Sequence, residues 1–584
     1  MIIGHRHGRK MNKSRTYSTV LLILLILAGS ALSVGGQTPA AGNSDPPEVR
    51  ARQAMDRGDS VQAISILNTA IADHPTPEIY LTLGSIYRRT RDFQKAEDTL
   101  AEAMVRYPND PRIPFELANV YLAAGDADSA REQLHRALQI DPKNADAADL
   151  LAAIELSEGE VQTALHYWNA TGFPIVNNVL HNTNVGFGHW TVREANAFKI
   201  GELMTYGQWR TTQRRLYNTQ VFSNVGVAVE PAPAPGRYNP VILTTDRKND
   251  LFNILFGIVK GSPYETAYLD YWDIGDSGIS LNSSYRWNFN RKRGEAHLYA
   301  PLPLPGILFL HSAGIWRSEN WSISNQVKTS QGSQNQFKYD STGIRTELQY
   351  IPNSRFDLGT GFEYVNRQGS GGPPQLLINN LNAAKFLFDG SFRMVDERYQ
   401  NRLHAEGYIA RKGILGLGDL NYSAATVELN NRFLISKDSQ LLLDWTLKGG
   451  NTWGQIPVED YFVLGVDQHS QNLLRGHRAQ IRGRYGNAPM GTSFGLANFN
   501  AERRIAIIPL FNSLNLPYLD LKAYFFLDFG KTWDRENIFK EGQLFVDTGG
   551  GLRIGLPTQT VSLLYGHSTQ DGGNFFLINI EKRW

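Results

Sequence analysis

The sequence predicts a multidomain chain: an α-helical solenoid, a small α+β domain, and a C-terminal transmembrane antiparallel β-barrel. A basic stretch and a short apolar run open the chain, a pattern of 34 residues repeats in its first third, and the last part alternates apolar and polar residues. These three observations call for different elements, because helices and strands have different hydrophobic periods. The predicted domains are a signal peptide (1–36), a linker (37–49), a repeat arm (50–172), a small periplasmic domain (173–249) and a barrel (250–584).

The N-terminus has the pattern of a secretory signal peptide. Five basic residues precede the apolar run 20–28, and small residues continue through Gly36. A helical membrane anchor is the alternative, but the nine apolar residues of this run fall well short of the roughly 20 that a spanning helix needs. No later apolar run reaches that length, so a membrane-resident form of the chain would have to be a barrel.

Composition argues against several classes of function. The net charge of +2 gives no electrostatic reason to expect nucleic acid as a partner. The absence of cysteine excludes disulfides, cysteine–zinc sites and thiol catalysis. A kinase-like triplet and a phosphate-loop ending near residue 530 lack the rest of their motifs, and no histidine pair has metal-ligand spacing. We therefore expect no catalytic residues, no metal and no cofactor, and the chain is not expected to be an enzyme.

The segment 50–172 repeats every 34 residues. Small and large apolar residues recur at fixed positions, namely Leu83, Gly84, Tyr87 and Ala96, then Leu117, Ala118, Tyr121 and Ala130, then Leu151. This pattern resembles the tetratricopeptide repeat, in which small residues let paired helices approach closely while larger ones fill the space between them. A generic helical bundle has no reason to repeat at this period. Stacked helical hairpins present a concave surface that binds protein segments, so we expect a periplasmic or lipoprotein partner there.

Residues 173–249 have a mixed pattern. It predicts helices over 193–200 and 205–217, followed by strands over 225–229 and 241–245. Leu216, Phe222 and Val225 stand where the polypeptide-transport-associated (POTRA) domain has a helix ending in Leu, then Phe and a strand. The segment resembles that domain, whose βααββ fold is then expected. A small α+β linker domain without this relationship is the alternative.

The last 335 residues contain many short runs in which apolar and polar residues alternate. In the run 522–533, Phe525 and Phe529 share one face while Phe526 and Asp528 share the other, as expected for a lipid-facing and a lumen-facing side. Sixteen strands at roughly 21 residues each account for the length, although 14 or 18 strands also fit. A soluble sandwich or propeller is the alternative fold.

Three motifs follow one another in this last part. They are the loop motif Leu474-Arg475-Gly476-His477, the strand motif Phe526-x-Asp528-x-Gly530, and a tail with Phe576, Ile578, Ile580 and Trp584 on one face. In this order and at this spacing they resemble the BamA/TamA-like outer-membrane assembly superfamily, also called the surface-antigen barrel family. The resemblance covers the chain from residue 173 onward, and the tail corresponds to the family's C-terminal targeting signal.

The resemblance implies an ion pair between Arg475 on a long inward-folded loop and Asp528 on a lumen-facing strand. A guanidinium offers a planar fork that can clamp a carboxylate with two bonds, and Gly476 lets the backbone turn beside it. His477 departs from the family, which usually has an aromatic ring there, and this departure affects the packing around the loop tip. Trp584 replaces the more common terminal Phe.

The resemblance implies a function in the outer membrane, with the N-terminal domains in the periplasm. The chain would insert outer-membrane proteins or translocate a polypeptide, with unfolded outer-membrane or secreted polypeptides as substrates and the repeat arm as a docking surface. Its other partner would be the outer-membrane lipid bilayer. The alternative is a porin-like channel or transporter with a scaffolding arm.

Overall fold

The computed structural model describes most of the chain after the N-terminal segment. The described residues are 45–582 except 184–188, 248, 250–253, 256–257, 259–264, 288–289, 305–307, 324–335, 374–375, 377–379, 396–397, 415, 437–439, 466–472, 478–479, 482–483, 486–487, 510–517, 540–542, 556–558 and 570–572. The predicted signal peptide and Trp584 lie outside them. The chain divides into two compact units. The first contains the described residues up to Asn178 with Lys199–Tyr206 and Glu230–Asn239, and the second contains the remainder.

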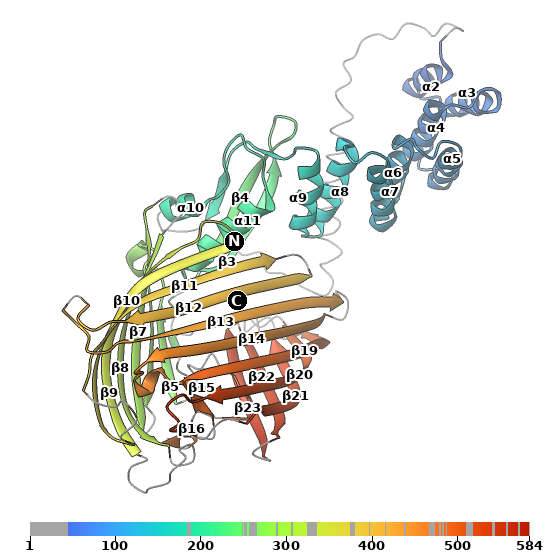
Figure 1. Cartoon of the computed structure of the whole chain (residues 1–584). Coiled ribbons are helices and arrows are strands. Elements are labelled where there is room, and N and C mark those ends of the chain that lie inside the picture. Colours follow the sequence, from blue (N-terminus) through green and yellow to red (C-terminus); the bar gives the residue numbers. More distant parts are fainter. Residues whose placement is uncertain are drawn as a thin grey trace. The chain divides into compact units, whose positions relative to one another are not determined.

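The first unit begins with eight helices that follow one another in antiparallel pairs (Figure 1). They are α2 (Pro47–Asp56), α3 (Ser60–Asp73), α4 (Pro77–Arg89), α5 (Phe93–Arg106), α6 (Arg112–Ala124), α7 (Ala127–Ile140), α8 (Ala145–Ser157) and α9 (Val161–Ala170). Side chains cap several of their N-termini: those of Asp59, Thr76, Asp126 and Asn144 each accept a hydrogen bond from a backbone amide of the first turn. These caps satisfy amides that have no partner within the helix.

The residues that repeat at 34 positions form the core of these helices. Eight of the nine predicted packing residues are buried, and Tyr121 is half-buried. The Tyr121 hydroxyl donates a hydrogen bond of 2.9 Å to Glu97 Oε1, and burial together with this carboxylate raises the pKa of Tyr121 to about 12. Gly84 is required because a Cβ there would lie 2.8 Å from Leu100 Cγ.

The segment after the repeats begins with the two-residue strand β1 (Ile175–Val176). The elements of a βααββ unit follow in order: β2 (Leu180–Thr183), α10 (His189–Ala195), α11 (Tyr206–Asn218), β3 (Phe222–Pro231) and β4 (Arg237–Asp246). β2 runs parallel to β4, and β3 also pairs with β4. The helix predicted over 193–200 instead ends at Ala195. The Asn196 side chain accepts a hydrogen bond from the Phe198 amide, and a local bond of this kind competes with continuation of the helix.

The second unit is dominated by one antiparallel sheet of fifteen described strands, which curves round on itself (Figure 1). They are β5 (Thr266–Tyr271), β6 (Ser280–Trp287), β7 (Arg291–Leu302), β8 (Leu308–Ser322), β9 (Gln336–Tyr350), β10 (Phe356–Gly371), β11 (Ala383–Val395), β12 (Tyr399–Ala410), β13 (Tyr422–Ser436), β14 (Leu441–Gly454), β19 (Ser493–Pro509), β20 (Tyr518–Trp533), β21 (Phe545–Gly555), β22 (Gln559–Ser568) and β23 (Asn574–Lys582). Each pairs with its sequence neighbour, except that β14 pairs with β19. Sixteen strands for the whole chain stays a prediction.

Shorter elements lie between or beside these strands. They are the 3-10 helices η2 (Ile274–Asp276) and η4 (Val458–Asp460) and the two-residue strands β15 (Phe462–Val463), β16 (Gln480–Ile481), β17 (Arg484–Tyr485) and β18 (Met490–Gly491). Apart from η2, all of them lie in the long loop 455–492 that joins β14 to β19. In the described part of the chain, the helices are all too short or too polar to cross a membrane.

The two faces of the sheet differ as the alternation predicted. On β20, Phe526 and Asp528 are fully buried, whereas Phe525 is 53% exposed. Large apolar side chains also cover the outward face of other strands, among them Ile344, Leu358, Phe386 and Phe576. An outward apolar face around a polar interior is the pattern of a membrane barrel.

The close contact between Gly84 and Leu100 generates a first prediction. Gly84→Val would place methyl groups where the Leu100 side chain lies, and overpacking of this kind costs about 1–3 kcal/mol. Thermal unfolding of the full chain, followed by the helical circular dichroism signal, measures the loss. Val61→Ala is the matched control, because Val61 is 77% exposed and its truncation is expected to change stability by less than about 0.5 kcal/mol. Equal stability of the two variants would contradict the prediction.

Candidate functional site

The candidate site is built on one row of inward-facing polar residues across three neighbouring strands. In the registers of β19, β20 and β21, Asn498 stands opposite Asp528, and Asp528 stands opposite Asp547. Both carboxylates are fully buried. Like charges directly opposite each other on adjacent strands repel, and buried charges need hydrogen-bond donors. Asn498 supplies one donor, since its Nδ2 lies 2.7 Å from Asp528 Oδ1.

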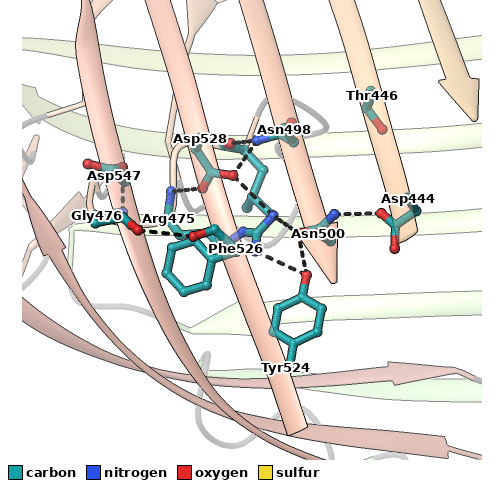
Figure 2. Close-up of polar contacts among 12 residues, drawn as sticks. Asp444, Thr446, Arg475, Gly476, Asn498, Asn500, Tyr524, Phe526, Asp528 and Asp547 are labelled. Atoms are coloured by element: carbon teal, nitrogen blue, oxygen red, sulfur yellow. Dashed lines mark hydrogen bonds and ion pairs between the residues drawn. The ribbon is translucent and has the colours of Figure 1, made fainter. Parts of the chain in front are cut away.

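The tip of the loop 455–492 supplies the other donors (Figure 2). The Arg475 amide donates to Asp528 Oδ2 at 3.3 Å, and the next amide, that of Gly476, donates to Asp547 Oδ2 at 2.7 Å. His477 Nδ1 lies 3.1 Å from the same Asp547 oxygen. Three consecutive residues therefore bind two adjacent carboxylates, which attaches the loop tip to the inner wall of the sheet.

The Arg475 guanidinium is shared among several groups. Its Nη2 lies 3.1 Å from Asp528 Oδ1 and donates to Asn500 Oδ1 at 2.6 Å, while Nη1 donates to the Tyr524 hydroxyl at 3.0 Å. Its Cζ also lies 4.4 Å from the centre of the Phe526 ring. The structure brings the predicted pair together, but the expected two-pronged clamp of the guanidinium on one carboxylate is wrong. The second bond to Asp528 comes from the backbone amide, so the side chain can also reach Asn500 and Tyr524.

The loop tip and the sheet wall approach each other closely at the glycines of the loop motif and the strand motif. A Cβ at Gly476 would lie 2.6 Å from Asp547 Oδ1, and a Cβ at Gly530 would lie 2.8 Å from Leu474 Cδ1. Leu474 is fully buried, so the glycine of the strand motif makes room for the first residue of the loop motif. A Cβ at Gly549 would likewise meet the Phe526 ring at 2.8 Å.

His477 lies at the position where the sequence resemblance leads us to expect an aromatic ring. Its side chain is fully buried and its ring makes an edge contact with Phe545 at 4.7 Å between centroids. Imidazole thus keeps an aromatic contact and adds a nitrogen for Asp547. A phenylalanine would keep only the first of these contacts.

Sequence reasoning missed Asp547, Asn498 and Asn500. A signal was present, because the alternation "ANFNAE" places both asparagines on the inward face of their strand and Asp547 occupies an inward position of the next hairpin. Their shared row could not be read from the sequence, since it depends on the register between strands. Within the described residues, no group of three or more His, Cys, Asp or Glu side chains is arranged to hold a metal ion.

The predicted C-terminal signal lies on the last described strand. Phe576 and Ile578 are 53% and 41% exposed, on the face that carries the outward apolar residues. Ile580 pairs with Val561 through the backbone. The targeting role of these residues stays a prediction.

A second polar contact joins α11 to the turn between β9 and β10. Arg215 Nε donates to the Ile351 carbonyl at 3.0 Å and its Nη2 to the Pro352 carbonyl at 3.1 Å. The neighbouring Arg214 donates to the Ser354 carbonyl at 2.6 Å and forms an ion pair with Asp357. Burial lowers the pKa of the Arg215 guanidinium from its usual value. Arg214 also donates to the Asn353 carbonyl at 3.4 Å, so the two adjacent arginines bind the four consecutive carbonyls of residues 351–354.

Comparison with known proteins gives a firm result for the helical arm. Residues 49–111 and 87–154 each match the family Tetratricopeptide repeat. The helices within residues 49–154 are tetratricopeptide repeats. Among curated proteins, none matches the chain.

Several solved structures match the chain over most of its length. BamA from Haemophilus ducreyi lacking POTRA domains 1–3 is 11% identical with a TM-score of 0.42, covering 70% of this chain and 84% of that one. CdiB from Escherichia coli is 9% identical with a TM-score of 0.49, covering 75% and 87%. CdiB from Acinetobacter baumannii is 9% identical with a TM-score of 0.45, covering 79% and 86%. All three TM-scores lie below 0.5, so the likeness is loose.

The loop-tip contacts generate a second prediction. Arg475→Ala removes the guanidinium and leaves Asp528 buried without its cation, which is expected to cost about 3–5 kcal/mol. Adding Asp528→Asn removes the uncompensated charge, so the double variant should recover part of that loss. Denaturant unfolding of the full chain in detergent micelles compares the wild type, Arg475→Ala, Asp528→Asn and the double variant. Strictly additive losses of stability would contradict a direct interaction between Arg475 and Asp528. Arg503→Ala is the control, because Arg503 lies on the exposed face of β19.

The α11 contact generates a third prediction. Arg215→Ala removes two charge-assisted hydrogen bonds to carbonyls, each worth about 1.5–3 kcal/mol, so local opening should become at least about ten-fold more frequent. Hydrogen exchange of the peptides that contain 206–218 and 351–355 measures this opening. Arg210→Ala on the same helix is the control, since Arg210 contacts Gln213 within the helix. Unchanged exchange in Arg215→Ala would show that the contact does not restrain the helix.

Proposed function

We propose that the chain inserts outer-membrane proteins or translocates a polypeptide across the outer membrane, as a member of the BamA/TamA-like superfamily. The observation that carries this proposal is the loop tip Arg475-Gly476-His477 bound to Asp528 and Asp547 on the inner wall. This contact fastens a long inward-folded loop to two buried carboxylates of the wall. A protein that moves chains across or into a membrane must keep its interior closed between events, and an anchored loop serves that purpose.

The outward apolar face supports placement in a membrane, and the predicted signal peptide 1–36 supports export. We infer that residues 37–49 are a linker, that the repeats occupy 50–172, that 173–249 form a POTRA-like domain and that 250–584 form the membrane barrel. The N-terminal domains would then lie in the periplasm. The contact of α11 with the turn 351–354 agrees with this order of domains along the chain, because the contact joins the βααββ segment to one end of the sheet.

The βααββ segment supplies a means of capturing substrate. β4 pairs with β1, β2 and β3, so β2 and β3 are each paired on one side only within the described small sheet. An extended polypeptide can add to such an edge through main-chain hydrogen bonds without any demand on its sequence. The tetratricopeptide repeats would add a second docking surface, for a substrate or for a periplasmic or lipoprotein partner.

Depletion of the protein followed by quantitative proteomics of the outer membrane tests this function. Broad loss of barrel proteins is expected for a general insertase, and loss of a single surface or secreted protein for a dedicated translocation factor. Re-expression of Arg475→Ala at wild-type level should restore the lost proteins only partly, because the loop tip is loosened. If depletion removes no outer-membrane protein but alters the permeability to small solutes, the proposed function is wrong. The chain would then be a porin-like channel.

A further inference from the structure

Four arginines from three different elements meet at the end of the sheet that contacts α11. Arg210 and Arg214 belong to α11, Arg393 to β11 and Arg402 to β12. The charges of the other three all act on the Arg393 guanidinium. All four residues lie within the second compact unit of the chain. We call these four residues the arginine cluster.

Local rules disfavour both halves of the arginine cluster. Arg210 and Arg214 are one helical turn apart on α11, where like charges repel. Arg393 and Arg402 stand directly opposite each other on neighbouring strands, where like charges also destabilise. Departures of this kind from local rules are expected at functional sites, so the cluster requires an explanation beyond folding.

One carboxylate of the chain neutralises part of this charge. Asp357 on β10 is buried and forms an ion pair with Arg214. Its Oδ2 lies 3.2 Å from Arg393 Nη2 and also accepts a hydrogen bond of 2.8 Å from the Ser391 hydroxyl. Asp357 therefore has its partners within the chain, and it holds two of the four arginines in place.

The rest of the positive charge is not neutralised by the described part of the chain. Arg210 donates a hydrogen bond of 3.4 Å to the neutral side chain of Gln213. Among the described residues, Nε of Arg393 and Nε of Arg402 are buried without a hydrogen-bond partner. The Arg393 side chain as a whole is 33% exposed, so a ligand can reach it. Guanidinium groups in such surroundings require acceptors, which indicates an anion from outside the chain.

The strand arginines face the interior of the sheet. Asp389 on β11 and Glu406 on β12 line a polar interior cavity of about 580 Å³. Because side chains alternate along a strand, Arg393 and Arg402 lie on the same inward face, two inward positions closer to α11. Lipid covers the outward face of a membrane barrel, so the inward face favours a polypeptide over a lipid headgroup as the bound anion.

The charge of the wall changes sign along these two strands. Asp389 and Glu406 stand directly opposite each other, as Arg393 and Arg402 do. A carboxylate that is attracted to the arginines is therefore repelled by the acidic pair further along the wall. An acidic segment would be held at the α11 end of the interior.

We propose that the arginine cluster binds acidic side chains of an extended polypeptide at the α11 end of the interior. Guanidinium groups bind carboxylates through charge-assisted and often two-pronged hydrogen bonds. Alternate side chains of an extended segment point to one side, roughly 6.6–6.8 Å apart, so successive acidic residues can reach different arginines. The identity of this polypeptide as a transported substrate rests on the proposed function, whereas the binding of acidic segments does not.

Peptide binding to the full chain in detergent micelles tests the cluster. The probe is a fluorescently labelled, C-terminally amidated peptide with aspartate at alternate positions, and its matched partner has asparagine instead. Fluorescence anisotropy should show that the aspartate peptide binds about ten-fold or more tightly than the asparagine peptide. Arg210→Gln with Arg402→Gln should remove most of this difference, and this variant leaves both ion-pair partners of Asp357 in place.

Arg411→Gln with Lys412→Gln is the matched control. It also removes two cations, which are exposed and follow the opposite end of β12. Equal affinity for the two peptides, or unchanged affinity in the Arg210→Gln, Arg402→Gln variant, would overturn the proposal. If dihexanoyl phosphatidylglycerol displaces the aspartate peptide at a lower concentration than the unlabelled peptide does, the cluster is a lipid-headgroup site and the proposal is wrong.

A chemical readout of position follows from the absence of cysteine in the chain. Gln400→Cys places a single thiol on β12 beside Arg402, at an exposed position. A maleimide carried by the aspartate peptide should label this thiol about ten-fold faster than one carried by the asparagine peptide. Lys412→Cys is the control, where the two rates should be equal. Equal rates at Gln400→Cys would place the binding elsewhere and overturn the proposal.

Folding and function are separated from this test. Heat-modifiable gel mobility reports whether each variant is folded. If the double variant is not, Arg402→Gln alone should still weaken binding of the aspartate peptide by about three-fold, and an unchanged affinity would again count against the cluster. Depletion without loss of any outer-membrane protein would sink the proposed function and leave the acidic-segment site standing, whereas equal binding of the two peptides would do the reverse.

Discussion

Two buried carboxylates on neighbouring strands, Asp528 and Asp547, set the constraint on which the interior of this protein depends. They stand directly opposite each other in the sheet, where like charges repel and water is excluded. The constraint is met by donors from the loop tip: two consecutive backbone amides, a guanidinium and an imidazole. The carboxylates and the loop stabilise one another, because the acids need donors and the loop needs an attachment.

The glycines around this centre follow from the same constraint. The loop tip lies so close to the wall that Gly476 and Gly530 have no room for a Cβ, and Gly549 makes room for the Phe526 ring beneath the guanidinium. The loop motif and the strand motif are therefore two halves of one packing arrangement. Their spacing along the chain reflects the length of the loop and the strand between them.

The loop crosses from one part of the wall to another, with η4 attached at β10 and β11 through Glu459 and Asp460 and the tip at β19, β20 and β21. A protein that handles polypeptides, as we propose for this chain, needs a closed state that can be released. Charged attachments suit that need, since a buried ion pair is costly to leave half-made and therefore tends to be fully formed or fully released. The α11 arginines connect the same sheet to the segment that precedes it in the chain.

Local patterns in the sequence determined a large part of this protein. The period of 34 located the helical repeats, and the alternation in 522–533 assigned Phe525 and Asp528 to opposite faces. The pairing of Arg475 with Asp528 came from the resemblance of two short motifs to a known family. Tertiary structure alone decided that Asp547 and Asn498 share a row with Asp528, that the guanidinium divides its bonds among several partners, and that η4 rests on β10 and β11. The physical reason is that strand register and the path of a long loop arise from contacts between residues far apart in the chain, which a local pattern does not encode.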